Sequence, residues 1–523
     1  MADLIQIKQI VENKILPHTR EWAVSERNRI RNKIRFAKSE DDLMHQVNIL
    51  NEKTDGFFID FDKILDSLEA DDVQESVQQE FQKIKSMLNA KDTKNSEALY
   101  RLSALCMNKF YLFTVQDTDE IFVYESGVYV PYGEIKIAQF IQKGLGGLSS
   151  IHVVNETLAH IRRSSYKNRI KIVEPIYKIC LNNGILDLNT MEVEPHNFDI
   201  IFFNKIPVDF DSESKCNKFE EFLKQILPED THNIIQEIFG YVLFKKYNIH
   251  KAIMFVGVGA NGKSTLLNVL RYFLGNQNIS AIPLQQLCIN RFSVSSLFGK
   301  LANIYADLSS AELKETGIFK ALTGEDSIRA ERKFKDEFFF DNYAKLIFSC
   351  NAVPKTPDDS DAFFRRWIII NFPNQFIGSS ANKDLLSKLT TESELSGILN
   401  WAIIGLKRLL DNKDFSTAKS VKEVREEYIR MSDSVKAFIM DCIKISPESF
   451  EQKRELFTHY TDYCREKSYP PLSEGTFHRD LQRSIRVEDY RPQLEIEGIK
   501  QRVQCWKGIK HQKSENGGDV QRL

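Results

Sequence analysis

A glycine-rich segment in the middle of the chain has the residues and spacing of a phosphate-binding loop. Gly257, Gly262, Lys263 and Ser264 fit the pattern Gly-x-x-x-x-Gly-Lys-Ser, and the apolar run Ala252–Val256 precedes them. Glycines let such a loop wrap phosphate with its backbone N–H groups, and the N-terminus of a following helix adds positive potential. We expect Lys263 to neutralise nucleotide phosphates and Ser264 to ligate Mg²⁺, so the sequence predicts ATP and Mg²⁺ as cofactors. The predicted cofactor-binding residues are Gly257, Gly259, Ala260, Asn261, Gly262, Lys263, Ser264 and Thr265.

Two polar residues stand at the ends of later runs of strand length. Asp307 follows Leu301–Ala306, where a carboxylate can hold Mg²⁺ or polarise water. Asn351 follows Leu346–Cys350, where an amide can hold the attacking water or sense the γ phosphate. Asp and Asn are also common at the ends of strands because their side chains stabilise turns, and that interpretation stays open for both residues. The predicted catalytic residues at these positions are Lys263, Asp307 and Asn351, and the predicted metal ligands are Ser264 and Asp307.

Two adjacent arginines, Arg365 and Arg366, come directly before the apolar run Trp367–Ile370. A guanidinium there can reach across a subunit boundary and stabilise charge on a transferring phosphoryl group, as arginine fingers do. We expect Arg366 to take this catalytic role, with Arg365 as the second choice. The alternative is a surface salt bridge to one of the nearby carboxylates, which are Asp358, Asp359 and Asp361.

The runs that carry these residues predict the fold. Four apolar runs of strand length recur between residues 252 and 370, with helical or loop segments between them. Buried strands separated by crossovers predict a parallel sheet, so we expect an α/β core that carries the P-loop. Short runs at Ile121–Tyr124 and Val128–Val130 indicate an α+β region ahead of this core, and Glu394–Leu410 is expected to be helical after it.

A carboxy-terminal segment has the pattern of a winged helix. Phe477, Leu481 and Ile485 form an apolar stripe on a predicted helix whose other faces are basic, and two alternating runs follow. From Ser473 to Lys513 there are nine Lys or Arg and six Asp or Glu. A recognition helix with a basic wing suits duplex DNA, and a domain used only for packing is the alternative. The predicted DNA-binding residues here are Arg479, Arg483 and Lys507.

At 523 residues the chain is too long for one core, since a domain takes roughly 100 to 200 residues. We predict six segments: 1–95, a charged helical region of unknown role; 96–245, an α+β domain; 246–385, the ATPase core; 386–430, a helical extension; 431–511, the winged helix; and 512–523, a polar tail.

Bulk composition restricts the partners. The net charge is only -2, so binding to nucleic acid has to rest on local basic patches. Eight cysteines are scattered with no Cys-x-x-Cys pair, which indicates reduced intracellular thiols and no zinc site. The amino terminus lacks the apolar stretch of a signal peptide, and no run approaches membrane-spanning length. We therefore expect a cytoplasmic protein with no membrane partner.

Taken in order, these motifs resemble those of superfamily 3 helicases, in the branch of poxvirus, phage and plasmid primase-helicases. Lys263, Asp307 and Asn351 follow one another at intervals of 44 positions, the compact spacing of that branch. Residues near 111–250 resemble the domain that precedes the motor there, and the region from about Asp433 resembles its winged helix. The matching motor segments are Gly257–Thr265, Asp307, Lys320–Asp326, Leu346–Asn351 and Asp361–Arg366.

The resemblance implies an ATP-dependent replicative DNA helicase of a virus, phage or plasmid-like mobile element, with an AAA+-like motor. It implies a homo-hexameric ring that hydrolyses ATP between subunits and moves along single-stranded DNA, usually 3′ to 5′. Single-stranded and forked DNA would be its substrates, a separate primase or polymerase its partner, and the host-cell cytoplasm its location. In this family a hairpin after the second motif lines the pore, here Ser327–Lys335; a solvated basic turn is the alternative. The implied pore residues are Arg329, Arg332, Lys333, Phe334 and Lys335.

Three questions stay open. Many relatives carry two acidic residues together at the second motif, whereas Asp307 stands alone, so the catalytic base is undecided and Glu312 is one option. An ATP-dependent initiator that melts an origin without travelling would share every motor motif. A primase-helicase would need a further active site, and Ile59–Asp62 and Ser150–His152 resemble parts of one, but too few residues precede the first.

Overall fold

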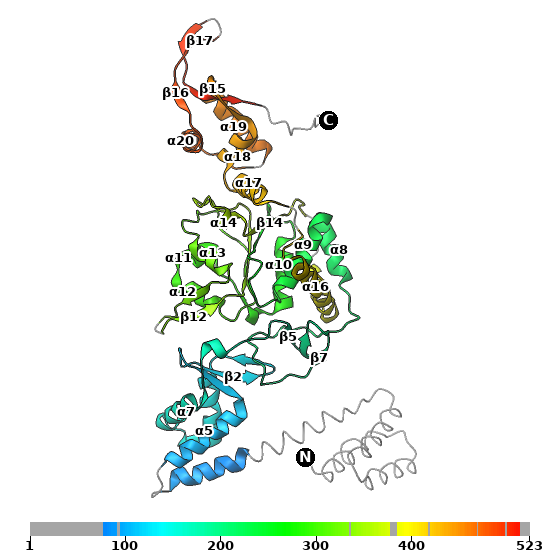
Figure 1. Cartoon of the computed structure of the whole chain (residues 1–523), viewed down its shortest axis with the longest axis vertical. Coiled ribbons are helices and arrows are strands. Elements are labelled where there is room, and N and C mark those ends of the chain that lie inside the picture. Colours follow the sequence, from blue (N-terminus) through cyan, green and yellow to red (C-terminus); the bar gives the residue numbers. More distant parts are fainter. Residues whose placement is uncertain are drawn as a thin grey trace, which may run out of the picture. The chain divides into compact units, whose positions relative to one another are not determined.

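The computed structural model describes residues 77–90, 95–333, 336–376, 384–416, 419–467, 469–496 and 499–512. They form two compact units (Figure 1). The smaller unit holds the described residues up to Val123 together with Pro131–Lys167, and the larger holds Tyr124–Val130 and the described residues from Asn168 on. Most of the predicted segments 1–95 and 512–523 lies outside the described residues, as does the primase-like run Ile59–Asp62.

The smaller unit combines helices and short strands. β1 (Leu112–Val115) pairs antiparallel with β2 (Ile121–Glu125) and parallel with β4 (Tyr166–Lys167). The predicted run Ile121–Tyr124 is therefore a strand. Ser150 caps a helix by accepting a hydrogen bond from Val153 N, so it has a structural role at the start of that helix. The helices are α5 (Ser96–Phe110), α6 (Gly133–Leu145) and α7 (Ile151–Ser165).

The larger unit is built on a five-stranded parallel sheet in the order β14-β8-β13-β10-β9. β8 is buried along its whole length, as a strand covered on both faces should be. Four of the strands coincide with the apolar runs of the sequence, which confirms the predicted parallel α/β core. The strands are β8 (Ala252–Val256), β9 (Ile279–Ser280), β10 (Ala302–Tyr305), β13 (Lys345–Cys350) and β14 (Trp367–Asn371).

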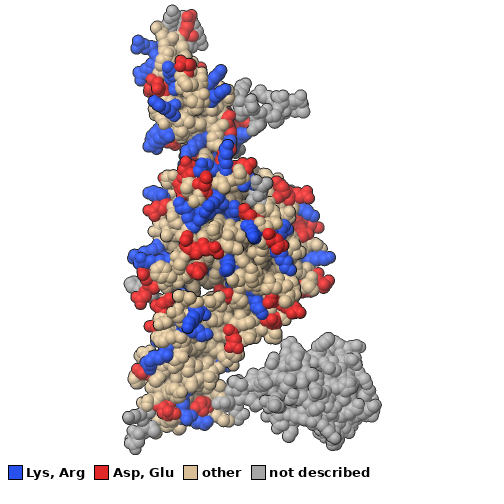
Figure 2. Space-filling view, viewed as in Figure 1, with Lys and Arg blue, Asp and Glu red and all other residues tan. Residues whose placement is uncertain are grey.

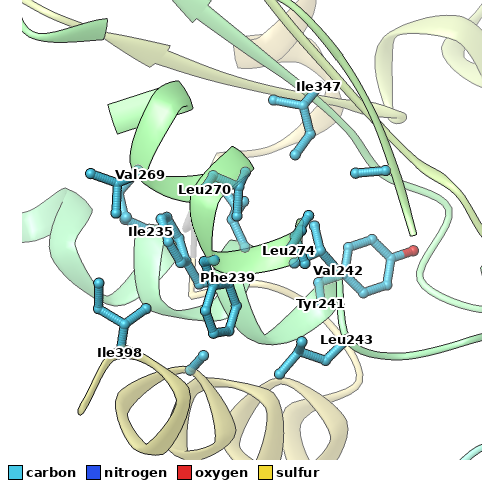
Figure 3. Packing of buried hydrophobic residues seen from close by; sticks show 14 of the residues in the cluster. Ile235, Phe239, Tyr241, Val242, Leu243, Val269, Leu270, Leu274, Ile347 and Ile398 are labelled. Carbon is cyan, nitrogen blue, oxygen red and sulfur yellow. The ribbon is translucent and has the colours of Figure 1, made fainter. Parts of the chain in front are cut away.

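Alternate residues of these strands serve two hydrophobic cores, one on each face of the sheet. Ile253 and Phe255 of β8 join the first core and Met254 joins the second. In the first core, helices α9 (His232–Tyr241), α10 (Lys263–Leu274) and α16 (Glu392–Asn412) interlock, and Figure 3 shows their side chains meeting. The second core holds residues of α11 (Leu284–Ile289), α13 (Gly317–Leu322) and α17 (Val421–Ser432).

Shorter elements complete the larger unit, and among them β5, β6 and β7 form a separate three-stranded antiparallel sheet. α8 precedes β8 in the chain, the hairpin β11–β12 stands between β10 and β13, and α14 immediately precedes the two arginines. The bounds are β3 (Val128–Val130), β5 (Lys178–Leu181), β6 (Gly184–Asp187), β7 (Val193–Glu194), α8 (Asn217–Ile226), α12 (Arg291–Val294), β11 (Ser327–Ala330), β12 (Phe338–Asp341), α14 (Asp361–Phe364) and α15 (Leu385–Leu389).

The carboxy-terminal elements have a core of their own. Phe477 and Leu481, two members of the predicted stripe, are fully buried there beside Trp506. β19 lies between β15 and β16 in an antiparallel sheet, and β17 and β18 form a separate hairpin. The bounds are α18 (Ser434–Cys442), β15 (Ile443–Gln452), α19 (Lys453–Glu466), α20 (Glu474–Ser484), β16 (Glu488–Tyr490), β17 (Gln493–Ile496), β18 (Ile499–Arg502) and β19 (Cys505–His511).

All eight cysteines occupy described positions, and each is a buried free thiol. In the part of the chain that the structure describes, no helix is long and apolar enough to cross a membrane.

Candidate nucleotide site and nucleic-acid surfaces

The loop between β8 and α10 is shaped by two glycines. Gly262 has a φ of +86°, in the left-handed region, and a Cβ there would lie 2.5 Å from Cγ2 of Ile226. A Cβ on Gly257 would lie 2.4 Å from Nδ2 of Asn261. Around Gly259, in contrast, no atom lies within 4 Å of an added Cβ, so the middle of the loop borders open space.

Lys263, the first residue of α10, is directed into this loop. It is only 5% exposed, and its Nζ donates to the carbonyl of Gly257 and, at 3.0 Å, to Oδ1 of Asn261. Burial lowers the pKa of Lys263. Nδ2 of Asn261 is buried and has no hydrogen-bond partner among the described residues. An unmet buried donor beside an ammonium group is suited to an anion, because the unpaired donor is costly as it stands. Ser264 is exposed and Thr265 half-buried.

The carboxyl ends of β8, β13 and β10 lie side by side and bring the predicted catalytic residues to one edge of the sheet. Gly257 N donates to the carbonyl of Cys350 at 3.3 Å, which joins the loop to the end of β13. Burial raises the pKa of the Cys350 thiol to about 12, with Lys263 lowering it and Asp307 raising it further. Leu308 N donates to the carbonyl of Ser349 at 2.8 Å, which brings the residue after Asp307 to the end of β13 as well. Asp307 and the next residue after Cys350, Asn351, are exposed at the same edge.

The segment after β14 also borders the loop, although its sequence gives no signal of this. Phe376 N donates to the carbonyl of Ala260 at 2.7 Å. Nε2 of Gln375 reaches the carbonyl of Gly259 at 3.5 Å. These contacts depend on the position of β14 beside β8, which only the folded sheet reveals.

The two arginines lie in different environments. Arg366 is 7% exposed, and its guanidinium donates to Thr323 Oγ1 at 2.9 Å, to the Lys320 carbonyl at 3.2 Å and to the Ala362 carbonyl. Burial lowers its pKa. Arg365 is exposed. All three guanidinium nitrogens of Arg366 are engaged within its own chain, which favours the exposed Arg365, the second choice, for a role across a subunit boundary.

The carboxylates near the arginines are engaged elsewhere. Asp358 lies 2.9 Å from Nζ of Lys320. Asp359 and Asp361 lie 3.7 and 3.2 Å from Nη2 of Arg425, on α17. Within the described ranges, no ion pair joins any of these aspartates to the two predicted arginines, so the salt-bridge alternative has no support there.

The predicted hairpin is present as β11 and β12, paired antiparallel. Arg329 and Phe339 are cross-strand partners, and both are exposed. Arg329 forms ion pairs with Glu331 and Glu337, so its charge is already opposed on the surface.

Residues nearer the tip of the hairpin differ from one another. Arg332 is half-buried, and its guanidinium carbon lies 5.2 Å from the centre of the buried Phe338 ring. Lys333 is exposed. Phe334 and Lys335 lie outside the described residues.

Two of the three predicted DNA-binding residues of the carboxy-terminal domain are exposed, and Lys507 is half-buried. The side chains of Arg479 and Arg483 on α20 are 59% and 73% exposed, with Asp480 between them. Lys507 lies 6.0 Å from the centre of the Tyr490 ring. On the face that Figure 2 shows, basic and acidic side chains are intermixed, in keeping with the net charge of -2. A DNA-binding surface on this face would therefore have to consist of a small group of basic residues.

Two families match parts of the chain. Residues 114–228 match a family described as D5 N terminal like. Residues 255–366 match a family of unknown function, DUF5906, and this match contains the whole loop, Asp307, Asn351 and both arginines.

The chain is similar to two viral proteins that are named as helicases. "Putative helicase L207/L206" of Acanthamoeba polyphaga mimivirus is 29% identical over 217 residues, which cover 39% of this chain and 22% of that protein. "Putative helicase 184R" of Invertebrate iridescent virus 6 is 21% identical over 274 residues, covering 48% and 26%. The chain thus matches about a quarter of the length of these relatives.

Among solved structures, the apo C-terminal region of NrS-1 (305–718) has a TM-score of 0.41 at 13% identity, covering 78% of this chain and 99% of that one. Another apo form of the same region has a TM-score of 0.40 at 12% identity.

Proposed function

We propose that this chain is an ATP-dependent replicative DNA helicase of a virus or related mobile element. The observation that carries the proposal is the meeting of Lys263, Asp307 and Asn351 at the carboxyl edge of a parallel sheet. That edge is where α/β proteins bind their ligands. The similarity to two viral proteins named as helicases supports the same assignment.

The loop fits a chain of phosphates. The open space at Gly259, the unmet donor of Asn261 and the buried ammonium of Lys263 together favour an anion. The hydroxyl of Ser264 and the carboxylate of Asp307 are the oxygen ligands that Mg²⁺ prefers. ATP with Mg²⁺, when bound, supplies the phosphoryl group whose transfer to water releases the free energy for movement.

The protein's own groups then have separate tasks. Lys263 neutralises phosphate charge, Asp307 polarises the attacking water, and Asn351 orients that water. Arg365 of one subunit stabilises charge in the site of the next, within a homo-hexameric ring. Arg366 instead holds the segment that carries Arg365.

DNA contacts follow from the same assignment. In this proposal the hairpin β11–β12 lines the central channel and holds single-stranded DNA, with travel from 3′ to 5′. The carboxy-terminal domain acts as a winged helix that holds duplex DNA through α20. A separate primase or polymerase completes the replication machinery.

Strand displacement on forked DNA tests the proposal. Unwinding is expected to require ATP, Mg²⁺ and a 3′ tail, and Lys263→Ala should abolish it while DNA binding persists, because the lysine acts on phosphates. Lys388→Ala, at an exposed lysine of α15, is the matched control and should unwind normally. Undiminished ATPase in Lys263→Ala would remove the motor assignment. Melting confined to one duplex sequence would instead identify an origin initiator.

A further inference from the structure

Arg425 of α17 holds the segment that leads to Arg365. Its Nη2 donates to the carbonyl of Asp359 and lies 3.2 Å from Oδ1 of Asp361. Its guanidinium carbon lies 5.1 Å from the centre of the Phe364 ring. One side chain on a distant helix therefore contacts three of the six residues directly before Arg365.

A second residue of α17 contacts the same segment from the hydrophobic core. Tyr428 is 1% exposed, and its hydroxyl donates to the carbonyl of Pro354 at 2.8 Å. Its ring packs edge-on against Phe363 and Phe364, with centroids 5.4 and 5.6 Å apart. α14 has only four residues, too few to be stable alone, so these contacts from α17 define its position.

The contacts of Arg425 have more effect on position than on stability. The side chains of Asp359 and Asp361 are 85% and 79% exposed, so ion pairs to them contribute little to the free energy of folding. Nε of Arg425 is buried and has no hydrogen-bond partner in the described part of the chain, which is itself unfavourable.

We propose that Arg425 is a positioning residue for Arg365: it orients α14 so that the Arg365 guanidinium faces the nucleotide of the neighbouring subunit. This rests on the proposed function. α17 is followed directly by Asp433, whose side chain caps α18 of the carboxy-terminal domain and pairs with Lys355 at 2.9 Å. The same helix thus connects the arginine segment to the domain assigned to duplex DNA.

Mixed rings test which side of the shared site Arg425 serves. A purely structural defect would not depend on which variant is the partner. Lys263→Ala and Arg365→Ala proteins are mixed first, because such rings contain interfaces with an intact lysine and an intact arginine. Partial recovery of ATPase is expected. Arg425→Ala should then recover ATPase when mixed with Lys263→Ala and should fail to recover it when mixed with Arg365→Ala.

The expected size of the effect follows from geometry. Misplacing a reacting group by about 1 Å can lower turnover by about 10²-fold, so kcat of Arg425→Ala should fall by that order with KM for ATP little changed. Arg425→Lys should recover part of the rate, because an ammonium group still reaches Asp361. Arg430→Ala is the matched control, since Arg430 lies on the same helix but pairs with Asp441; it should keep normal turnover.

The outcomes separate the two proposals. If Lys263→Ala and Arg365→Ala fail to complement in rings shown to exchange subunits, the shared site of the proposed function is wrong. If they complement but Arg425→Ala recovers with both partners or with neither, Arg425 does not act through Arg365. Asp361→Ala removes the ion pair with Arg425 from an exposed position, so it repeats the test should Arg425→Ala fold poorly.

Discussion

Arg365 and Arg366 are adjacent in sequence, yet their environments are opposite. The sequence identified the pair as able to act on phosphate but favoured Arg366. That choice depended on partners far along the chain, because Thr323 and Lys320 surround the Arg366 guanidinium only after folding. No local pattern distinguishes two arginines before a strand. Asn261 is a similar case, since its unmet donor appears only in the folded loop.

The two arginines should therefore fail in different ways when replaced. Arg366→Ala removes three donors from a buried site and should lower the free energy of unfolding by about 2 to 3 kcal/mol. Arg365→Ala should change stability by less than about 0.5 kcal/mol, as for exposed positions, but lower ATP turnover by ~10³-fold or more. Urea denaturation and steady-state ATPase measure these quantities. A stable Arg366→Ala protein that binds ATP without hydrolysing it would restore the original choice.

At the scale of elements, apolar runs located four of the five strands of the sheet. β9 was missed because its two residues, Ile279 and Ser280, are too short to form a periodic pattern. The resemblance predicted a hairpin at the position of β11–β12, but it did not predict which of its charged side chains form ion pairs. Arg329 is opposed by Glu331, directly after β11, and by Glu337, directly before β12, and the register of the two strands decides such pairs.

The hairpin gives a prediction that separates its basic residues. Lys333→Ala with Lys335→Ala should weaken single-stranded DNA binding and reduce the magnitude of the slope of log K against log salt by about 1.4, at ~0.7 per phosphate contact. Arg329→Ala is the matched control and should reduce that magnitude less, because two carboxylates already oppose Arg329. Binding isotherms over a series of salt concentrations measure both. Equal slopes in the double variant and the unmodified protein would exclude this hairpin from the DNA path.

At the scale of the whole molecule, the sequence predicted several parts without locating the division between the two units. The break at Lys167–Asn168 falls inside the predicted segment 96–245. It follows a short strand and a basic stretch that continues without a change of composition, so the sequence contains no linker signal there. Compact units are defined by contacts between distant residues, and one sequence read alone does not display such contacts.

The carboxy-terminal domain should be separable from the motor in its effect on DNA. Arg479→Ala with Arg483→Ala should reduce the magnitude of the salt slope for duplex binding by about 1.8, at ~0.9 per phosphate. ATPase stimulated by single-stranded DNA should be unchanged, since neither residue contacts the nucleotide loop. Arg465→Ala, 80% exposed on α19, is the control and should bind duplex normally. Equal loss of binding to single-stranded and duplex DNA would contradict a dedicated duplex surface.

The buried cysteine thiols allow the rate of local opening to be measured separately in the two units. Burial raises the pKa of Cys106 and of Cys350 to about 12, so reactive thiolate is scarce in the closed protein. An alkylating reagent then modifies each cysteine only during transient exposure, at a rate set by the free energy of local opening. The alkylation rate of Cys106 reports on opening of the smaller unit, and that of Cys350 reports on opening at the end of β13, where it contacts the phosphate loop. A nucleotide that holds the loop closed should lower the rate of alkylation at Cys350 and leave the rate at Cys106 unchanged.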